Sequence, residues 1–395
     1  MKKKLYIGIV ALFILLGSPL LYILTTSTLL ERQNGLYRYW ALSHLSTQYL
    51  ESDESAEDVM ERASLYIELI EEDFLLDGMV INHDVIRKPL DVCDSLLFTS
   101  LYFISLKKLG HHQRADSVWA AIKKSKEGGK WLRHPQCPKP ASRDMVLGIL
   151  AAFSQDLPDA KPLLQETLKY IKLHKGFFSH GSVDVSFLTP GVAEFFRIYA
   201  KAYSIESHET PYNLQYSFST SEFSALGSST GYQTHLIALQ SWIEMELLSK
   251  PKFSKELWQR NALLPFNALG NLTGTRPVDQ RISWITEKIY SADPNNLFYK
   301  WLRLKSAGAL TPQTRKLLLF ELANMPQFPR DRLPENCDRS ADYLWQRDSA
   351  EHFSQADVCT KTFNGVDFIW MAALLLEDEL GPEHPTLSPQ TPENQ

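Results

Sequence analysis

The chain has 395 residues, of which 44% are hydrophobic and 22% are charged, and its formal net charge at pH 7 is −5. This composition is typical of a globular protein and argues against a fibrous or wholly disordered chain. Because the charge balance is slightly acidic and no basic stripe runs along the sequence, it also argues against nucleic acid as a partner.

The N-terminus has the pattern of a membrane anchor. A basic tip with three lysines, residues 1–4, precedes an uncharged and mostly apolar run over residues 5–30. At about 1.5 Å per residue this run is long enough to cross a hydrocarbon core of about 30 Å. It lacks the small-residue exit of a cleaved signal peptide, which favours an uncleaved transmembrane anchor. Since lysines mark the cytoplasmic side, we expect a single-pass protein of a bacterial inner membrane whose remaining chain is periplasmic.

The cysteines fit an oxidising compartment. Their even number suggests two disulfides, although spacing alone does not fix how they pair. We expect Cys93 to pair with Cys137 and Cys337 with Cys359, because each pair flanks one local segment. We expect no metal and no cofactor, since the sequence holds no C-x-x-C, H-E-x-x-H or nucleotide-binding glycine motif.

Beyond the anchor, helical periodicity dominates the sequence. Some segments carry apolar side chains on one face only, as in residues 56–76, 114–126 and 160–174. Others are apolar nearly all round, which predicts helices buried on most sides; these are residues 94–110 and 142–157. Alternation typical of a strand is scarce, and residues 177–188 are the only fair candidate.

This alternation of buried and amphipathic helices predicts an all-α domain over residues 31–380. Two concentric layers of helices satisfy the pattern, as does a stack of helix pairs. Because no fixed period of 34 or 40 residues is present, an α/α toroid with irregular loops is favoured over a tetratricopeptide solenoid. The proline-rich tail, residues 381–395, is expected to be disordered.

Three of the most apolar helices are preceded by similar polar residues. Asp91 and Asp94 come before one helix, Ser142, Arg143 and Asp144 open the second, and Asn364 and Asp367 precede the third. Capping accounts for each site separately, because a cap contributes about 1 kcal/mol and first-turn carboxylates complement the helix dipole. If the three helices form an inner ring, they run parallel, and their N-termini meet at a single opening.

This pattern resembles the six-hairpin, or (α/α)6, toroid of many carbohydrate-active enzymes, which place acidic residues and aromatic platforms at the mouth of the inner helices. The stretch SRDMVLGIL, residues 142–150, is similar to helix entrances of unsaturated-glucuronyl-hydrolase-like proteins. Residues 333–376 include two stretches similar to uncharacterised bacterial extracytoplasmic proteins. The resemblance implies a toroid that processes or binds a poly- or oligosaccharide.

A glycosidase needs two carboxyl groups beside the sugar bond, about 5 Å apart for retention and about 6.5–9.5 Å apart for inversion. Asp94 and Asp144 are our candidate catalytic pair, one acting as acid and the other as base. Arg143 is suited to an acidic sugar and Trp131 to stacking on a ring face, while His134 suits either proton transfer or a loop hydrogen bond. The residues that we expect to bind the glycan are Asp91, Trp131, Arg133, His134, Arg143 and Asp367.

A second motif, GSSTG at residues 227–231, matches the G-x-S-x-G of serine hydrolases and precedes a helix that carries His235. No strand of a parallel sheet precedes it, so a loop that caps the next helix is the favoured interpretation. The sequence leaves two functions open. One is a membrane-anchored glycan-processing or glycan-binding protein, with a cleft lined by Asp94, Arg143, Asp144 and Trp131. The other is a non-catalytic helical scaffold that binds an envelope protein through an exposed apolar groove.

Overall fold

The computed structural model of the chain describes residues 54–84, 90–137, 139–175, 177–179, 186–187, 190–205, 232–254, 277–292, 294, 296–324, 361–362 and 364–380. Helices make up most of these residues, and each strand is two or three residues long. The chain is therefore helix-rich, as predicted. The predicted anchor, the GSSTG motif, Cys337, Cys359 and the proline-rich tail lie outside the described residues. None of the helices within the described residues is long and apolar enough to cross a membrane.

The chain divides into two compact units. The large unit comprises residues 52–212 and 315–395, and the small unit comprises residues 1–51 and 213–314. The large unit contains α3 (Glu54–Asp73), α4 (Ser95–Lys108), α5 (His112–Lys124), α6 (Arg143–Phe153), α7 (Ala160–Leu173), α8 (Pro190–Ala202) and α17 (Val366–Leu380). The small unit contains α10 (Tyr232–Leu248), α13 (Pro277–Ala292) and α14 (Leu297–Ser306), and α15 (Pro312–Ala323) crosses the boundary in sequence.

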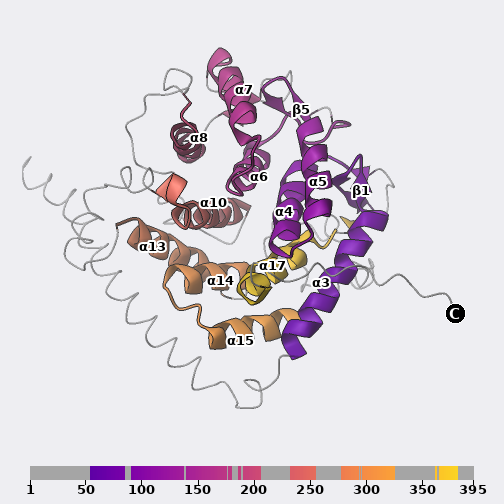
Figure 1. The fold of residues 1–395 in the computed structure, drawn as a ribbon, viewed down its shortest axis with the longest axis vertical. Helices are drawn as coiled ribbons and strands as arrows, with labels where there is room; N and C mark the ends of the chain where they lie inside the picture. Colours follow the sequence, from indigo (N-terminus) through magenta and orange to yellow (C-terminus); the bar gives the residue numbers. More distant parts are fainter. Residues whose placement is uncertain are drawn as a thin grey trace, which may run out of the picture. The chain divides into compact units, whose positions relative to one another are not determined.

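Helix α4 lies at the centre of the large unit, where it packs against α5, α6 and α17 (Figure 1). Residues 95–106 of α4 are all buried, which explains why this segment is apolar nearly all round. Three of its buried hydroxyl groups donate hydrogen bonds to carbonyl groups one turn earlier: Thr99 to Ser95, Ser100 to Leu96 and Ser105 to Leu101. These three donors are therefore satisfied within the helix, whereas Ser95 donates to the carbonyl oxygen of Val80 outside it.

Helices α4 and α6 run parallel to each other. At their N-terminal ends the amide of Leu97 donates a hydrogen bond to the sulfur of Met145, at 3.3 Å. At their C-terminal ends the ammonium group of Lys107 donates to the carbonyl oxygen of Gln155, at 3.4 Å. The helices approach closely because Gly148 has no side chain; a Cβ atom there would lie 3.1 Å from the Cα atom of Leu97.

Helix α17 runs in the same direction on another side of α4. Strand β3 (Asn82–Asp84) pairs antiparallel with both β4 (Leu90–Asp91) and β9 (Lys361–Thr362), so β4 and β9 point the same way into α4 and α17. At the opposite ends of the two helices, Lys108 and Glu377 form an ion pair at 2.5 Å. The N-terminal ends of α4, α6 and α17 therefore lie at one end of the large unit, which is the arrangement that the sequence analysis requires.

Helix α8 packs against α6. Tyr199 of α8 donates a hydrogen bond to the carbonyl oxygen of Leu150 in α6, and Tyr203, just after α8, donates to Asp156, just after α6. Helix α8 thus runs parallel to α6. Short antiparallel hairpins link several elements: β1 (Leu75–Leu76) with β2 (Met79–Val80), β5 (Lys126–Glu127) with β6 (Lys130–Trp131), and β7 (Phe177–Ser179) with β8 (Ser186–Phe187). The last of these hairpins occupies the predicted strand segment.

In the small unit, α10 and α14 are parallel and α13 is antiparallel to both. The rings of His235 and Tyr299 lie 5.2 Å apart near the starts of α10 and α14. Arg281, near the start of α13, donates to Glu244 near the end of α10, at 2.6 Å. Each unit therefore contains parallel helices, although the two units use different side chains to join them.

Candidate functional site

The N-terminal ends of α4, α6 and α17 form the candidate site, which we call the helix entrance and define by Asp94, Arg143, Asp144 and Asp367. Asp94 lies immediately before α4, and the other three lie in the first turns of α6 and α17. The contact between Leu97 and Met145 places the first turns of α4 and α6 against each other. Asp94 and Asp144 therefore come from adjacent helix starts, as predicted.

Capping does not account for the polar residues at the starts of α4 and α6. Asp94, and not Asp91, is the residue at the N-cap of α4, and its side chain makes no capping hydrogen bond. Asp91 instead lies in β4, where it pairs with Asn82 in the sheet. Ser142 is at the N-cap of α6, but its hydroxyl group donates to the carboxylate of Asp144 rather than accepting from the main chain.

Asp144 is only 4% exposed, so its carboxyl group is buried within the first turn of α6. The neighbouring Arg143 is half-buried, and no hydrogen bond or ion pair joins it to another described residue. A helix N-terminus carries partial positive charge, which stabilises an anionic group placed there. The start of α6 thus combines a buried carboxyl group, held by Ser142, with a guanidinium group that has no partner in the described part of the chain.

The start of α17 differs, because there a side chain does accept a hydrogen bond from a first-turn amide group. The side-chain oxygen of Asn364 accepts a hydrogen bond from the amide of Val366 at 3.0 Å, and its amide group donates to Asn82 at 2.8 Å. Asp367 is half-buried and accepts from the amide of Phe368. Asn364 is therefore a structural residue that ties α17 to β3, and sequence analysis misses its partner because Asn82 is far away in the chain.

Trp131 does not fit the predicted role of a sugar platform. Its side chain is 2% exposed, its indole N–H donates to Thr167 at 3.0 Å, and its ring packs against Phe153. A ring face buried in this way is not available to a ligand. The aromatic residue that sequence analysis assigned to the glycan is thus part of the core between α6 and α7.

His134 makes loop hydrogen bonds, which is the alternative that the sequence left open. Its side chain is fully buried, with the Nε2 atom 3.1 Å from the carbonyl oxygen of Leu76. The Nδ1 atom accepts from the amide of Gln136 at 3.0 Å. Because Nδ1 is an acceptor, Nε2 carries the proton and donates to Leu76. Both ring nitrogens are occupied by main-chain partners, which argues against a role in proton transfer.

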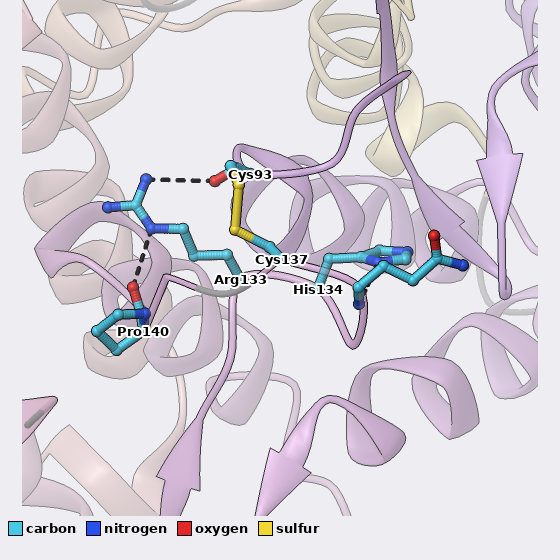
Figure 2. The surroundings of a disulfide bond; sticks show 6 residues. Cys93, Arg133, His134, Cys137 and Pro140 are labelled. Atoms are coloured by element: carbon cyan, nitrogen blue, oxygen red, sulfur yellow. Dashed lines mark hydrogen bonds between the residues drawn. A yellow bond between two sulfur atoms is a disulfide. The ribbon is translucent and has the colours of Figure 1, made fainter. Parts of the chain in front are cut away.

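Arg133 contacts main-chain groups on both sides of the entrance (Figure 2). Its Nε atom donates to the carbonyl oxygen of Pro140 at 2.9 Å, and its Nη1 atom donates to that of Cys93 at 3.3 Å. Cys93 and Cys137 form a disulfide, which is the pairing expected because the two cysteines flank one local segment. The guanidinium group is thus engaged with the protein, in contrast to that of Arg143.

One candidate was missed by sequence analysis. Glu194 is 7% exposed in the early part of α8, which is a further helix parallel to α6. The signal in the sequence is a carboxylate near the start of an apolar segment, the same signal that identified Asp144. It was overlooked because no Ser, Asn or Asp cap precedes it.

No three His, Cys, Asp or Glu residues of the described segments are grouped in a way that would hold a metal ion. The chain matches no protein-family model and no curated protein.

Proposed function

We propose that the protein binds or processes a glycan at the helix entrance, as a membrane-anchored protein with residues 5–30 in a bacterial inner membrane and its helical part in the periplasm. The observation that supports this most strongly is the parallel packing of α4 and α6, which brings Asp94 and Asp144 to neighbouring helix starts. A pair of carboxyl groups on opposite sides of a sugar bond is what glycoside hydrolysis requires.

Each residue has a distinct chemical role in this proposal. One of the two carboxyl groups, Asp94 or Asp144, donates a proton to the glycosidic oxygen, and the other, ionised, activates water or attacks the sugar. Arg143, which has no partner among the described residues, binds the carboxylate of an acidic sugar through two parallel hydrogen bonds. Asp367 lies at the third helix start and hydrogen-bonds sugar hydroxyl groups.

The fold that we propose for this function is the six-hairpin toroid. The parallel set α17, α4, α6 and α8 supplies an arc of inner helices, and α5, which follows α4 after a short turn, is one of the outer helices. In such a ring the inner helix starts surround one opening. A structure with bound oligosaccharide tests both the ring and the position of the ligand.

The alternative, a scaffold that binds an envelope protein, predicts a wide exposed apolar surface. Within the described residues, the large hydrophobic side chains that are exposed are Leu65 on α3 and Leu173 on α7. Two isolated leucines on different helices do not form such a surface, and this favours the glycan proposal.

The test is a binding and turnover screen of the purified full-length chain against envelope polysaccharides and their oligosaccharides, including glucuronic-acid-containing ones. We expect D94N and D144N each to reduce turnover at least a hundredfold, since acid–base catalysis contributes about 10²–10⁴-fold. R143M is expected to weaken binding of acidic sugars selectively. The matched control is D116N, which removes an exposed carboxylate of α5. Unchanged turnover of a proven substrate by D94N and D144N would exclude this pair.

A further inference from the structure

We propose that Arg133 and the Cys93–Cys137 disulfide together hold the starts of α4 and α6 at a fixed separation, so that Arg133 is a positioning residue and not a ligand-binding one. This inference rests on the proposed function, since the groups that are positioned are Asp94 and Asp144. It reassigns Arg133 on the basis of its two main-chain bonds.

The two hydrogen bonds of Arg133 reach the two segments that lead into these helices. Cys93 directly precedes Asp94 at the N-cap of α4, and Pro140 lies two residues before Ser142 at the N-cap of α6. The planar guanidinium group fixes the angle between its donors, so that the two carbonyl groups are held in a set relation. A single side chain therefore bridges both helix starts.

The disulfide makes the same connection by a covalent route. It joins Cys93 to Cys137, whose side chain is 3% exposed in the loop that ends at α6. The carbonyl oxygen of Cys93 is held by Arg133 while its sulfur is held by Cys137 (Figure 2). Since two groups of one residue are fixed, the segment before Asp94 has little freedom to shift or rotate.

The loop that carries both connections is itself firmly held. His134 donates to the carbonyl oxygen of Leu76, and the side chain of Gln136 donates to Asp77 at 2.9 Å. The amide of Ala141 donates to the carbonyl oxygen of Trp131 at 3.1 Å, which closes the base of the loop. Because the loop is fixed at these points, the start of α4 cannot move without moving the start of α6.

Parallel helices place like partial charges together, and each N-terminus carries about half a positive charge. Asp94 and Asp144, at the starts of α4 and α6, supply negative charge that offsets it. At the other end, the ammonium group of Lys107 lies against the carbonyl oxygen of Gln155. Arg133 and the disulfide therefore add a geometric connection at the entrance to this charge compensation.

The test measures hydrogen–deuterium exchange in the full-length chain for peptides covering residues 91–97 and 141–147. We expect R133M, and independently C93S/C137S, to raise exchange about tenfold or more in both peptides, and the combined variant to raise it further. The matched control is K139M, which removes an exposed positive charge from the same loop and is expected to leave exchange unchanged. Should R133M fail to fold, R133K replaces it, because one ammonium nitrogen does not reproduce the geometry of the planar fork.

A second readout separates positioning from simple loss of stability. The ¹³C signal of the Asp144 carboxyl group is expected to move in R133M and to stay in place in K139M. If exchange in R133M rises only within residues 131–137, with both helix starts and the Asp144 signal unchanged, the inference is overturned. Neither readout needs a glycan, so an unsuccessful glycan screen leaves this result standing. With a glucuronic-acid-containing disaccharide as probe, R143M is expected to lose binding at unchanged exchange, whereas R133M changes both.

Discussion

Buried helices are joined by different interactions in the two units. In the large unit, α4 and α6 meet through apolar side chains, hydroxyl groups bonded within their own helix, and the glycine at position 148. In the small unit, buried ion pairs join α10 to α13 and α13 to α14, through Arg281 with Glu244 and Arg303 with Glu287. Close apolar contact depends on shape, whereas a buried ion pair depends on both partners being present, so the two units should fail in different ways.

The largest effect is expected from removing one partner of a buried ion pair in the small unit. Arg281 is 2% exposed and donates to Glu244 at 2.6 Å, so R281M removes a buried ion pair, and we expect a loss of about 3–5 kcal/mol in the free energy of unfolding. Replacing both residues by leucine should restore most of this loss, because two apolar side chains leave no unpaired charge. Denaturant unfolding measures both values, with K250M as control, since Lys250 lies 4.0 Å from Glu246 in a pair that is only partly buried.

A smaller effect is expected from adding volume between α4 and α6. G148V places atoms against the main chain of Leu97 and the hydroxyl group of Ser100. We expect this crowding to lower the free energy of unfolding by about 1–3 kcal/mol. G148A should cost less, because the helix propensity of alanine, about 1 kcal/mol better than that of glycine, offsets part of the crowding. Thermal unfolding of the pair tests this order; a G148V variant as stable as the wild type would contradict the close approach of the helices.

Removing the Asn364 side chain before α17 should lower the free energy of unfolding by about 1–2 kcal/mol. N364A removes the hydrogen bond to the amide of Val366 and the donor to the side-chain oxygen of Asn82. N364D keeps the capping oxygen but not the donor to Asn82, and is expected to fall between N364A and the wild type. If N364D were less stable than N364A, the cap would not be the main contribution.

The smallest expected effect is a change in how the free energy of unfolding depends on pH. Burial, followed by the nearby Arg114 and His112, lowers the pKa of His111 below its ordinary value of 6.5. The unfolded chain then binds a proton more readily than the folded chain, so the free energy of unfolding decreases as pH falls through 6.5. H111Q should reduce this loss between about pH 8 and about pH 5. The thermal midpoint of the wild type should decrease relative to that of H111Q as pH falls, and a constant difference at all pH values would refute the assignment.

The sequence predicted those parts of the fold that leave a pattern of apolar and polar residues over more than one helical turn. The all-round apolar sequence of α4 identified a central helix, and the polar residues before α4, α6 and α17 indicated a common direction. Apart from the hairpin within residues 177–188, the short strands were not predicted, because two or three residues are too few for a period to be recognised. No change of composition marks the division into two units in the sequence.

The site was predictable only in part, because residue type does not determine what a side chain contacts. Arg143 and Asp144 lie in the first turn of α6, where the sequence placed them, but Trp131 and His134 are buried with partners from other elements. Trp131 is followed by Arg133 and His134 in a polar loop, which indicated an exposed ring. Its burial depends on Thr167 and Phe153, whose proximity is set by the packing of α6 against α7.

The sheet that joins β3 to β4 and β9 has a consequence for the order in which the protein is made. β9 and α17 come from residues 361–380, while α4, which α17 covers, is synthesised more than two hundred and fifty residues earlier. Until that late segment emerges from the ribosome, one side of α4 has no cover, and its leucines and phenylalanines are exposed to other chains. Nascent chains halted before residue 361 should therefore be captured by chaperones, and the large unit completes its folding only after its final helix has been translated.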